Sequence, residues 1–205
     1  MNWKCRRFLV WIVGIMLLGR IAPVRGDVQP LVIAPSDDGE IRSTLVVRTT
    51  FYVSPDGADG QGIVEFPMPS LNGPIGEATL GMELYGWPPQ SLVVHVYGYA
   101  SNDGILTTAD YNVGSYIGDL TMSFQGDPQG FERPLDVTEF LKTVNSPYVG
   151  FNFRTDHGLV VFSSLENNYD HPSLLSVTTV PEPAMWGVAT FGVGMLWARR
   201  RGTRR

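Results

Sequence analysis

The sequence contains very little cysteine and histidine. Its one cysteine, Cys5, lies in an N-terminal stretch that reads as a leader, so the rest of the chain has no thiol for a disulfide or for thiolate chemistry. The three histidines, His95, His157 and His171, are far apart and match no zinc-binding spacing, and no nucleophile-elbow motif accompanies them. We therefore expect a noncatalytic protein that is stabilised by burial alone.

Basic residues are scarce in the middle of the chain. Residues 27–180 contain five Lys or Arg side chains against nineteen Asp or Glu side chains, a formal charge of about −14 by simple counting. The other ten basic residues lie near the two termini. A domain this acidic repels phosphate, so we expect no nucleic-acid partner.

Charged residues of both signs make up only 17% of the 205 residues, and no low-complexity run is present. This length leaves room for one ordinary domain plus targeting segments. Aromatic and β-branched residues are frequent, while 23 glycines and 15 prolines supply many turns. The composition predicts one globular β domain, which we place at residues 27–179.

Residues 1–26 have the three-part pattern of a secretory signal peptide. The basic first part consists of Lys4, Arg6 and Arg7. An apolar stretch follows over residues 8–18, and small residues then lead to an expected cleavage between Gly26 and Asp27. Two arginines stand unusually close to that point, so an uncleaved N-terminal anchor is the alternative.

Residues 180–205 form a three-part tail. The tail begins with Val180, Pro181, Glu182 and Pro183. The apolar residues 184–198 follow, and at about 1.5 Å per residue a helix of this length covers roughly 22 Å, less than the roughly 30 Å of a hydrocarbon core. The chain ends in a basic cluster made of Arg199, Arg200, Arg201, Arg204 and Arg205. The positive-inside tendency keeps both basic ends cytoplasmic, so the middle domain should lie outside.

This tail resembles the PEP-CTERM sorting signal of Gram-negative bacteria, with Pro181, Glu182 and Pro183 as its motif. The resemblance implies export through the secretion translocon, a transient stay in the inner membrane, and removal of the tail by a membrane-embedded exosortase. It also implies a final place in the periplasm, at the cell surface or in the extracellular matrix, often in association with exopolysaccharide. A plain tail anchor is the alternative.

Short runs of β-type residues, separated by turn signals, recur through the middle of the chain. The expected strands are 44–53, 61–66, 77–85, 92–99, 116–124, 148–154, 159–163 and 173–179. Asp136 and Glu139 match a capping box and predict a short helix over residues 136–144. Eight strands at this spacing predict an all-β, jelly-roll-like sandwich, flanked by a signal helix and a C-terminal transmembrane helix.

The middle domain also contains an ordered set of segments that match a known module. These segments are residues 62–66, 75–80, 135–140, 162–166 and 171–175. In that order they resemble the opening strand pair, helix start and closing strands of the extracellular jelly-roll modules called DNRLRE domains, which are related to carbohydrate-binding modules. The sequence departs from this pattern at residues 101–114, which puts any family binding site there in doubt.

Two kinds of binding residue stand out in the middle domain. Asp103 and Asp110 end a segment that resembles the second half of a calcium loop, but Tyr99 and Ser101 occupy the first half, so we expect at most a weak calcium site and no other cofactor. Aromatic residues with flat faces could stack on sugars. These are Trp87, Tyr97, Tyr99, Tyr111, Tyr116 and Tyr169.

Three hypotheses about function follow. The first is an exported, noncatalytic surface or matrix protein. The second is a carbohydrate-binding module for an extracellular polysaccharide, which predicts exposed aromatic residues or an acid-lined cleft on one sheet face. The third is a glycan-active enzyme, which requires two carboxylates at a productive separation. We favour the first, because the two ends of the chain support it.

Overall fold

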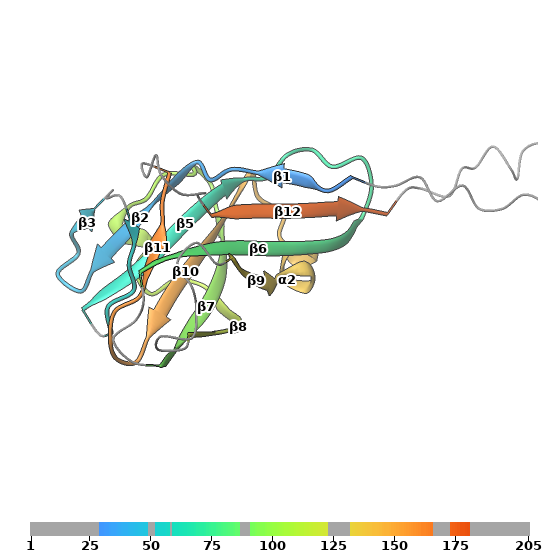
Figure 1. Ribbon diagram of the computed structural model, residues 1–205. Helices are drawn as coiled ribbons and strands as arrows, with labels where there is room; N and C mark the ends of the chain where they lie inside the picture. The colour runs from blue at the N-terminus through green and yellow to red at the C-terminus, as the bar shows by residue number, and fades with distance from the viewer. Residues whose placement is uncertain are drawn as a thin grey trace, which may run out of the picture.

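The computed structural model describes residues 29–48, 52–57, 59–86, 91–122, 132–165 and 173–180. Within these residues, twelve strands form two antiparallel sheets of six strands each, with one α-helix and one short 3-10 helix (Figure 1). The first, which we call the β5 sheet, contains in spatial order β3 (Val47–Arg48), β2 (Asp37–Arg42), β5 (Gly60–Pro67), β10 (Tyr148–Thr155), β7 (Leu92–Ser101) and β8 (Ser115–Met122). The second, the β6 sheet, contains β1 (Leu31–Ile33), β12 (Leu174–Thr179), β6 (Ile75–Gly86), β11 (Val161–Ser163) and β4 (Tyr52–Val53), together with β9 (Glu132–Asp136).

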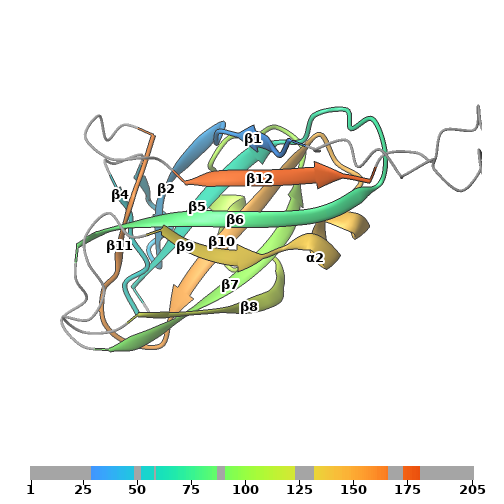
Figure 2. The ribbon, with the colours of Figure 1, turned by 45° about the vertical axis from the view of Figure 1, so that its right-hand side comes forward.

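Strand β6, twelve residues long, organises its sheet. Its first part pairs with β12, where Leu80 lies opposite Leu175, and its end pairs with β11, where Leu84 lies opposite Phe162. The other edge of β6 pairs with β9, where Leu80 lies opposite Leu135. Figure 2 shows β12, β6 and β9 crossing in front of the strands of the β5 sheet.

The two sheets share one hydrophobic core. Along β7 the alternate residues Leu92, Val94 and Val96 are buried on the core side, as the period of a strand requires. Phe153 of the β5 sheet meets Phe162 of the β6 sheet with ring centroids 5.7 Å apart. Burying each such ring stabilises the fold by about 1.5–3 kcal/mol. The all-β fold in two packed sheets is therefore confirmed.

Helix α2 (Thr138–Thr143) packs against both sheets. Phe140 lies against Gly98 of β7, where an added Cβ would come within 2.6 Å of the phenylalanine ring. Thr138 extends the pairing of β9 with β6, because its Oγ1 accepts a hydrogen bond from the Ala78 backbone N–H at 2.8 Å. Glycine at position 98 therefore lets the helix approach the sheet.

The helix lies within the predicted range 136–144, but the predicted capping box is wrong. The helix begins at Thr138, two residues after Asp136, whose Oδ1 accepts a hydrogen bond from the Thr138 N–H at 2.9 Å. Glu139 lies one turn before Lys142 and binds its Nζ at 2.7 Å. The N-cap residue is therefore Val137, which makes no side-chain capping hydrogen bond, and Glu139 lies at the second position of the helix instead of the third.

The strand predictions from residue 61 onward are confirmed as β5 to β8 and β10 to β12. The single strand predicted over residues 44–53 is wrong, because β3 and β4 belong to different sheets. Strands β1, β2 and β9 are additional. The charged segment of β2, with Gly39 inside it, has the composition of a turn, yet it pairs with β5 along its whole length. Strand β9 contains Pro134, which an edge strand tolerates.

The domain begins and ends side by side. Strands β1 and β12 pair with Leu31 opposite Val177, so β1 starts and β12 finishes at the same end of the molecule (Figure 1). The expected signal peptide, its cleavage point and tail residues 181–205 lie outside the described residues. Within the part of the chain that the structure describes, no helix is long and apolar enough to cross a membrane.

Candidate ligand-binding face

The β5 sheet has an outer face, turned away from the core, that carries polar and aromatic side chains. Side chains alternate between the two faces of a strand, and the strand register places these residues in neighbouring rows. They are Gln61, Ile63 and Glu65 on β5, Asn152 and Arg154 on β10, His95, Tyr97, Tyr99 and Ser101 on β7, and Tyr116 and Asp119 on β8. The outer face has two halves that differ in what covers them.

Residues 102–114, which we call the strap, connect β7 to β8 and cover one half. Leu106 of the strap is buried against Ile41 and Ile63, which form a second hydrophobic cluster apart from the main core. The Leu106 N–H donates to Asp37 Oδ2 at 2.8 Å. One apolar anchor and one charge-assisted hydrogen bond thus hold the strap on the sheet.

The strap also satisfies the amide side chains beneath it. Gln61 Oε1 accepts hydrogen bonds from the Asn112 N–H at 2.9 Å and from Asn152 Nδ2 at 2.8 Å. Asn152 Nδ2 also donates to the Asp110 carbonyl at 3.1 Å. Both Gln61 and Asn152 are buried. The chain therefore supplies partners to these polar groups where an uncovered face would need water or a ligand.

Glu65 is the buried carboxyl group of the covered half. It accepts hydrogen bonds from Tyr99 Oη at 2.8 Å and from Ser101 Oγ at 3.1 Å. Burial raises the pKa of Glu65, and the two hydrogen bonds lower it in part. Burial and the neighbouring Glu65 carboxyl also raise the pKa of Tyr99. Gly150 lies beneath the Tyr99 ring, and any side chain there would displace it.

The other half of the outer face, which we call the open patch, consists of His95, Tyr97, Tyr116, Asp119 and Asp156. The His95 and Tyr116 ring centroids lie 6.5 Å apart, and those of Tyr97 and Tyr116 lie 5.8 Å apart in an edge-to-face contact. Tyr116 is 56% exposed. The patch therefore presents flat rings and carboxylates to solvent.

Arg154 joins the two halves. Its guanidinium carbon lies 4.0 Å from the centroid of the Tyr97 ring, a cation–π contact. Its Nη2 donates to the Val113 carbonyl of the strap at 2.6 Å, and its Nε donates to Asn152 Oδ1 at 3.2 Å. Arg154 thus holds the end of the strap through Val113 and also packs against Tyr97 of the open patch.

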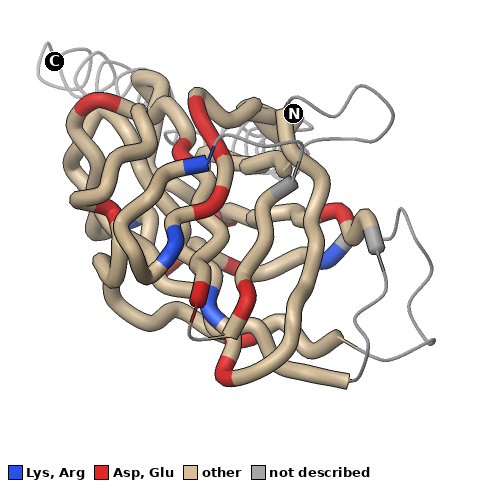
Figure 3. The backbone as a smooth tube through the Cα atoms, turned by 90° about the vertical axis from the view of Figure 1, so that its left-hand side faces the viewer, with Lys and Arg blue, Asp and Glu red and all other residues tan. Residues whose placement is uncertain are grey.

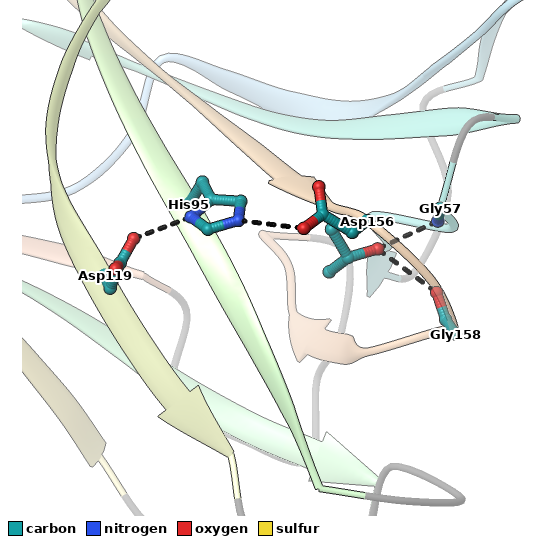
Figure 4. Close-up of polar contacts among 6 residues, drawn as sticks. Gly57, His95, Asp119, Asp156 and Gly158 are labelled. Atoms are coloured by element: carbon teal, nitrogen blue, oxygen red, sulfur yellow. Dashed lines mark hydrogen bonds and ion pairs between the residues drawn. The ribbon is translucent and has the colours of Figure 1, made fainter.

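His95 lies between two carboxylates in the open patch (Figure 4). Its Nδ1 is 2.7 Å from Asp119 Oδ1 on β8, and its Nε2 is 3.6 Å from Asp156 Oδ2 in the turn after β10. A hydrogen bond to Asp119 also raises the pKa of Tyr116. Asp119 therefore orients both His95 and Tyr116. His95 is therefore a strand histidine with a carboxylate beside each of its ring nitrogens.

The predicted calcium residues have partners within their own loop. Asp110 Oδ2 accepts hydrogen bonds from the Thr107 N–H at 2.7 Å and from Thr107 Oγ1 at 2.9 Å, which caps the short helix η1 (Thr108–Asp110). Asp103 Oδ1 accepts a hydrogen bond from the Ile105 N–H at 3.4 Å. Among the described residues, no group of three or more His, Cys, Asp or Glu side chains could hold a metal ion. The calcium site stays a prediction that this geometry does not favour.

The aromatic candidates divide between the two halves. Tyr97 and Tyr116 belong to the open patch, whereas Tyr99 and Tyr111 pack in the hydrophobic cluster under the strap. Trp87 and Tyr169 lie outside the described residues. Sequence reasoning missed the buried polar residues of the covered half. The signal that could have revealed them is the spacing of Gln61 and Glu65, which lie two residues before and after Ile63 and so share one face of β5.

Only the first residue of the predicted sorting motif falls in the described part of the chain. Val180 is 50% exposed, and its N–H donates to the Pro74 carbonyl at 2.9 Å. Residues 181–183 and the arginine cluster lie beyond it, outside the described residues. The chain therefore leaves the last strand at an exposed position.

The roles of these residues are inferred from the sequence and the geometry. No family model matches the chain, and no curated protein matches it either.

Proposed function

We propose that this protein is an exported, noncatalytic component of the cell surface or extracellular matrix that binds polysaccharide through its open patch. The observation that carries this proposal is the contact of the half-buried Tyr97 with the exposed Tyr116, beside the carboxylates of Asp119 and Asp156 on one sheet face. Aromatic rings stack on the apolar faces of pyranose rings, and carboxylates accept hydrogen bonds from sugar hydroxyl groups.

The charge of the domain favours an uncharged polymer. Figure 3 shows acidic positions on many strands and loops, with few basic positions among them. Residues 27–180 carry a formal charge of about −14, so a polyanion would be repelled at low ionic strength. The cation Arg154 contacts the patch through Tyr97, and its guanidinium is already hydrogen-bonded to the strap.

The proposed fold class within the two-sheet architecture is a jelly roll related to the DNRLRE modules. Support comes from the order of the matching segments and from the short helix α2 at the predicted position. The strap occupies residues 102–114, the region where the sequence departs from the module pattern. The open patch would then be what remains accessible of the outer face.

The proposed route is export by the signal peptide and sorting by the PEP-CTERM tail. In this scheme the translocon exports residues 27–180, and an exosortase cuts near Pro181, Glu182 and Pro183. The start of β1 and the end of β12 are neighbours, and this supports the route. Segments that precede β1 and follow β12 could then enter the same membrane on one side of the domain. The arginine cluster would stop the tail at the cytoplasmic face.

A binding assay tests the proposed ligand. We expect the processed wild-type protein to be retained by amorphous cellulose, chitin or starch, and to bind sodium alginate much less at low salt. The double variant Tyr97→Ala, Tyr116→Ala should lose this retention. The control Ile105→Ala removes an exposed side chain of the strap, which is 57% exposed, and should bind as wild type. Equal retention of the double variant would contradict the proposal.

Intact mass measured on fractionated native cells tests the proposed route. We expect loss of both ends, and C-terminal cutting that disappears when Pro181, Glu182 and Pro183 are replaced by alanine. A full-length species in the inner membrane, unaffected by that replacement, would make this protein a tail-anchored periplasmic domain instead.

A further inference from the structure

The imidazole of His95 connects three segments of the open patch. It extends from β7 toward Asp119 on β8 and toward Asp156 in the turn of residues 156–158 (Figure 4). The base of that turn is fixed by Thr155, whose Oγ1 accepts a hydrogen bond from the Gly57 N–H at 2.8 Å and donates to the Gly158 carbonyl at 3.2 Å. The Asp156 side chain is 83% exposed, and its carboxylate contacts His95.

The number of protons on His95 decides how many of these contacts hold. A protonated imidazole has two N–H donors and a positive charge, so it attracts both carboxylates. A neutral imidazole with its proton on Nδ1 keeps the 2.7 Å hydrogen bond to Asp119. Its Nε2 lone pair then faces the Asp156 carboxylate across 3.6 Å, and the attraction is lost. Deprotonation therefore releases Asp156 at the tip of the turn, and leaves β8 and the Thr155 hydrogen bonds at the base of the turn in place.

The surrounding charges favour the proton. The hydrogen bond to Asp119 raises the pKa of His95 most, desolvation lowers it, and Asp156 raises it further. The neighbouring elements also carry Tyr97 and Tyr99 on β7, Tyr116 on β8, Tyr148 and Arg154 on β10, and His157 in the turn. Arg154 lies opposite His95 in the strand register, but its charge is directed onto the Tyr97 ring and the strap.

The geometry points to a proton-controlled clamp: protonated His95 holds the turn of residues 156–158 against β7 and so sets the affinity of the open patch for polysaccharide. The effect on affinity rests on the proposed function, whereas the clamp itself does not. In the closed state, Asp156 is held in a fixed position beside the imidazole ring, so a ligand binds without the cost of ordering this side chain. In the open state that cost returns.

The sign of the pH dependence follows. The ordinary pKa of histidine is 6.5, and the pKa of His95 in the folded protein lies above it. The clamp is therefore complete below pH 6.5 and opens as the pH rises through the pKa of His95. We expect binding to amorphous cellulose or chitin to weaken roughly threefold to tenfold from pH 5.5 to pH 9, the size expected for ordering one side chain.

NMR spectroscopy of the processed protein tests the clamp without any ligand. The imidazole signal of His95, assigned from its loss in His95→Gln, should titrate above pH 6.5, and the amide signals of residues 156–158 should shift with the same midpoint. Asp156→Asn should lower that midpoint and remove the response of the turn. The control His157→Gln changes an exposed histidine of the same turn and should leave both unchanged.

Binding to the two polymers at pH 5.5 and pH 9 tests the regulation. His95→Gln and Asp156→Asn should each bind with little pH dependence, while His157→Gln should behave as wild type. A titration of His95 that leaves the amides of residues 156–158 unmoved would overturn the clamp. A wild type that binds neither polymer at either pH would overturn the proposed function and its regulation, and the clamp would then stand or fall on the NMR result alone.

Discussion

The two halves of the outer face place similar side chains in opposite situations. Under the strap, the polar groups of Gln61, Glu65 and Asn152 are buried and bonded to the chain itself. In the open patch, Tyr116 and the carboxylates of Asp119 and Asp156 remain accessible. The sheet thus carries a polar outer face throughout, and the strap decides which part of that face is available to a partner.

This difference separates the half that we expect to contribute most to stability from the half that we propose for binding. A buried polar group without a partner costs about 1–3 kcal/mol, so the hydrogen bonds from strap backbone groups to Gln61 and Asn152 stabilise the covered half. Exposed polar groups do not need a partner from the chain, because they form hydrogen bonds with water. The comparison can be tested by changing one residue at a time in each half and measuring the free energy of unfolding.

The largest effect is expected at the anchor of the strap. Leu106→Ala should lower the free energy of unfolding by about 2–3 kcal/mol, since it removes buried methyl groups between Ile41 and Ile63 and weakens the hold on the polar groups beside them. Denaturant unfolding measures the loss, and hydrogen exchange of the Leu106 amide, which donates to Asp37, should speed up.

Ile105→Ala is the matched control for this change, because the neighbouring side chain is also a large aliphatic group but points into solvent. It should change stability by less than about 0.5 kcal/mol. Equal losses for the two variants would mean that the strap rests on the sheet without an anchor, and the distinction between the two halves would fail.

The fold could be predicted where local pattern and tertiary role agree. Strand β7 alternates apolar and polar residues, and its neighbours in the β5 sheet do so nearly as clearly. Strand β2 breaks the pattern because Asp38 and Glu40 are buried, a role that composition assigns to apolar residues. Strand β9 is hidden by Pro134, which only its position at the sheet edge makes acceptable.

The candidate site could be predicted only in part. Tyr97 and Tyr116 belong to the aromatic candidates that the sequence offers, but so do Tyr99 and Tyr111, which are indistinguishable from them by residue type. The two pairs differ in their packing. Tyr99 and Tyr111 pack in the cluster where Leu106 contacts Ile63, although these two residues lie some forty positions apart in the sequence. Local periodicity contains no information on such a contact, because it reports only which face of its own strand a residue occupies.

A smaller effect is expected from the buried carboxyl group of the covered half. Burial raises the pKa of Glu65 above its usual value of 4.5. A group whose pKa is raised by folding contributes stability that is complete below its unfolded pKa and is lost as the pH rises through the folded pKa. The wild type should therefore lose stability above pH 4.5 at this residue, and Glu65→Gln should flatten that part of the profile.

Thermal unfolding between pH 4 and pH 8 measures this effect. Glutamine has nearly the same shape and can still accept the hydrogen bond from Tyr99 or Ser101, so the variant should fold. Glu77→Gln changes an exposed acid on β6 and should leave the profile as it is in the wild type. If Glu65→Gln does not alter the profile, this carboxyl group is in contact with water. The covered half would then lack the buried acid that distinguishes it from the open patch.

The smallest effect on stability is expected in the open patch. Tyr116→Ala removes a ring that is 56% exposed and lies on an edge strand, so the free energy of unfolding should change by less than about 0.5 kcal/mol. The same substitution should weaken retention by amorphous cellulose, chitin or starch, since the ring would stack on the sugar. A loss of stability as large as that of Leu106→Ala would instead make Tyr116 a structural residue. Residues in both halves would then contribute to stability, and coverage by the strap would not separate structural residues from residues proposed for binding.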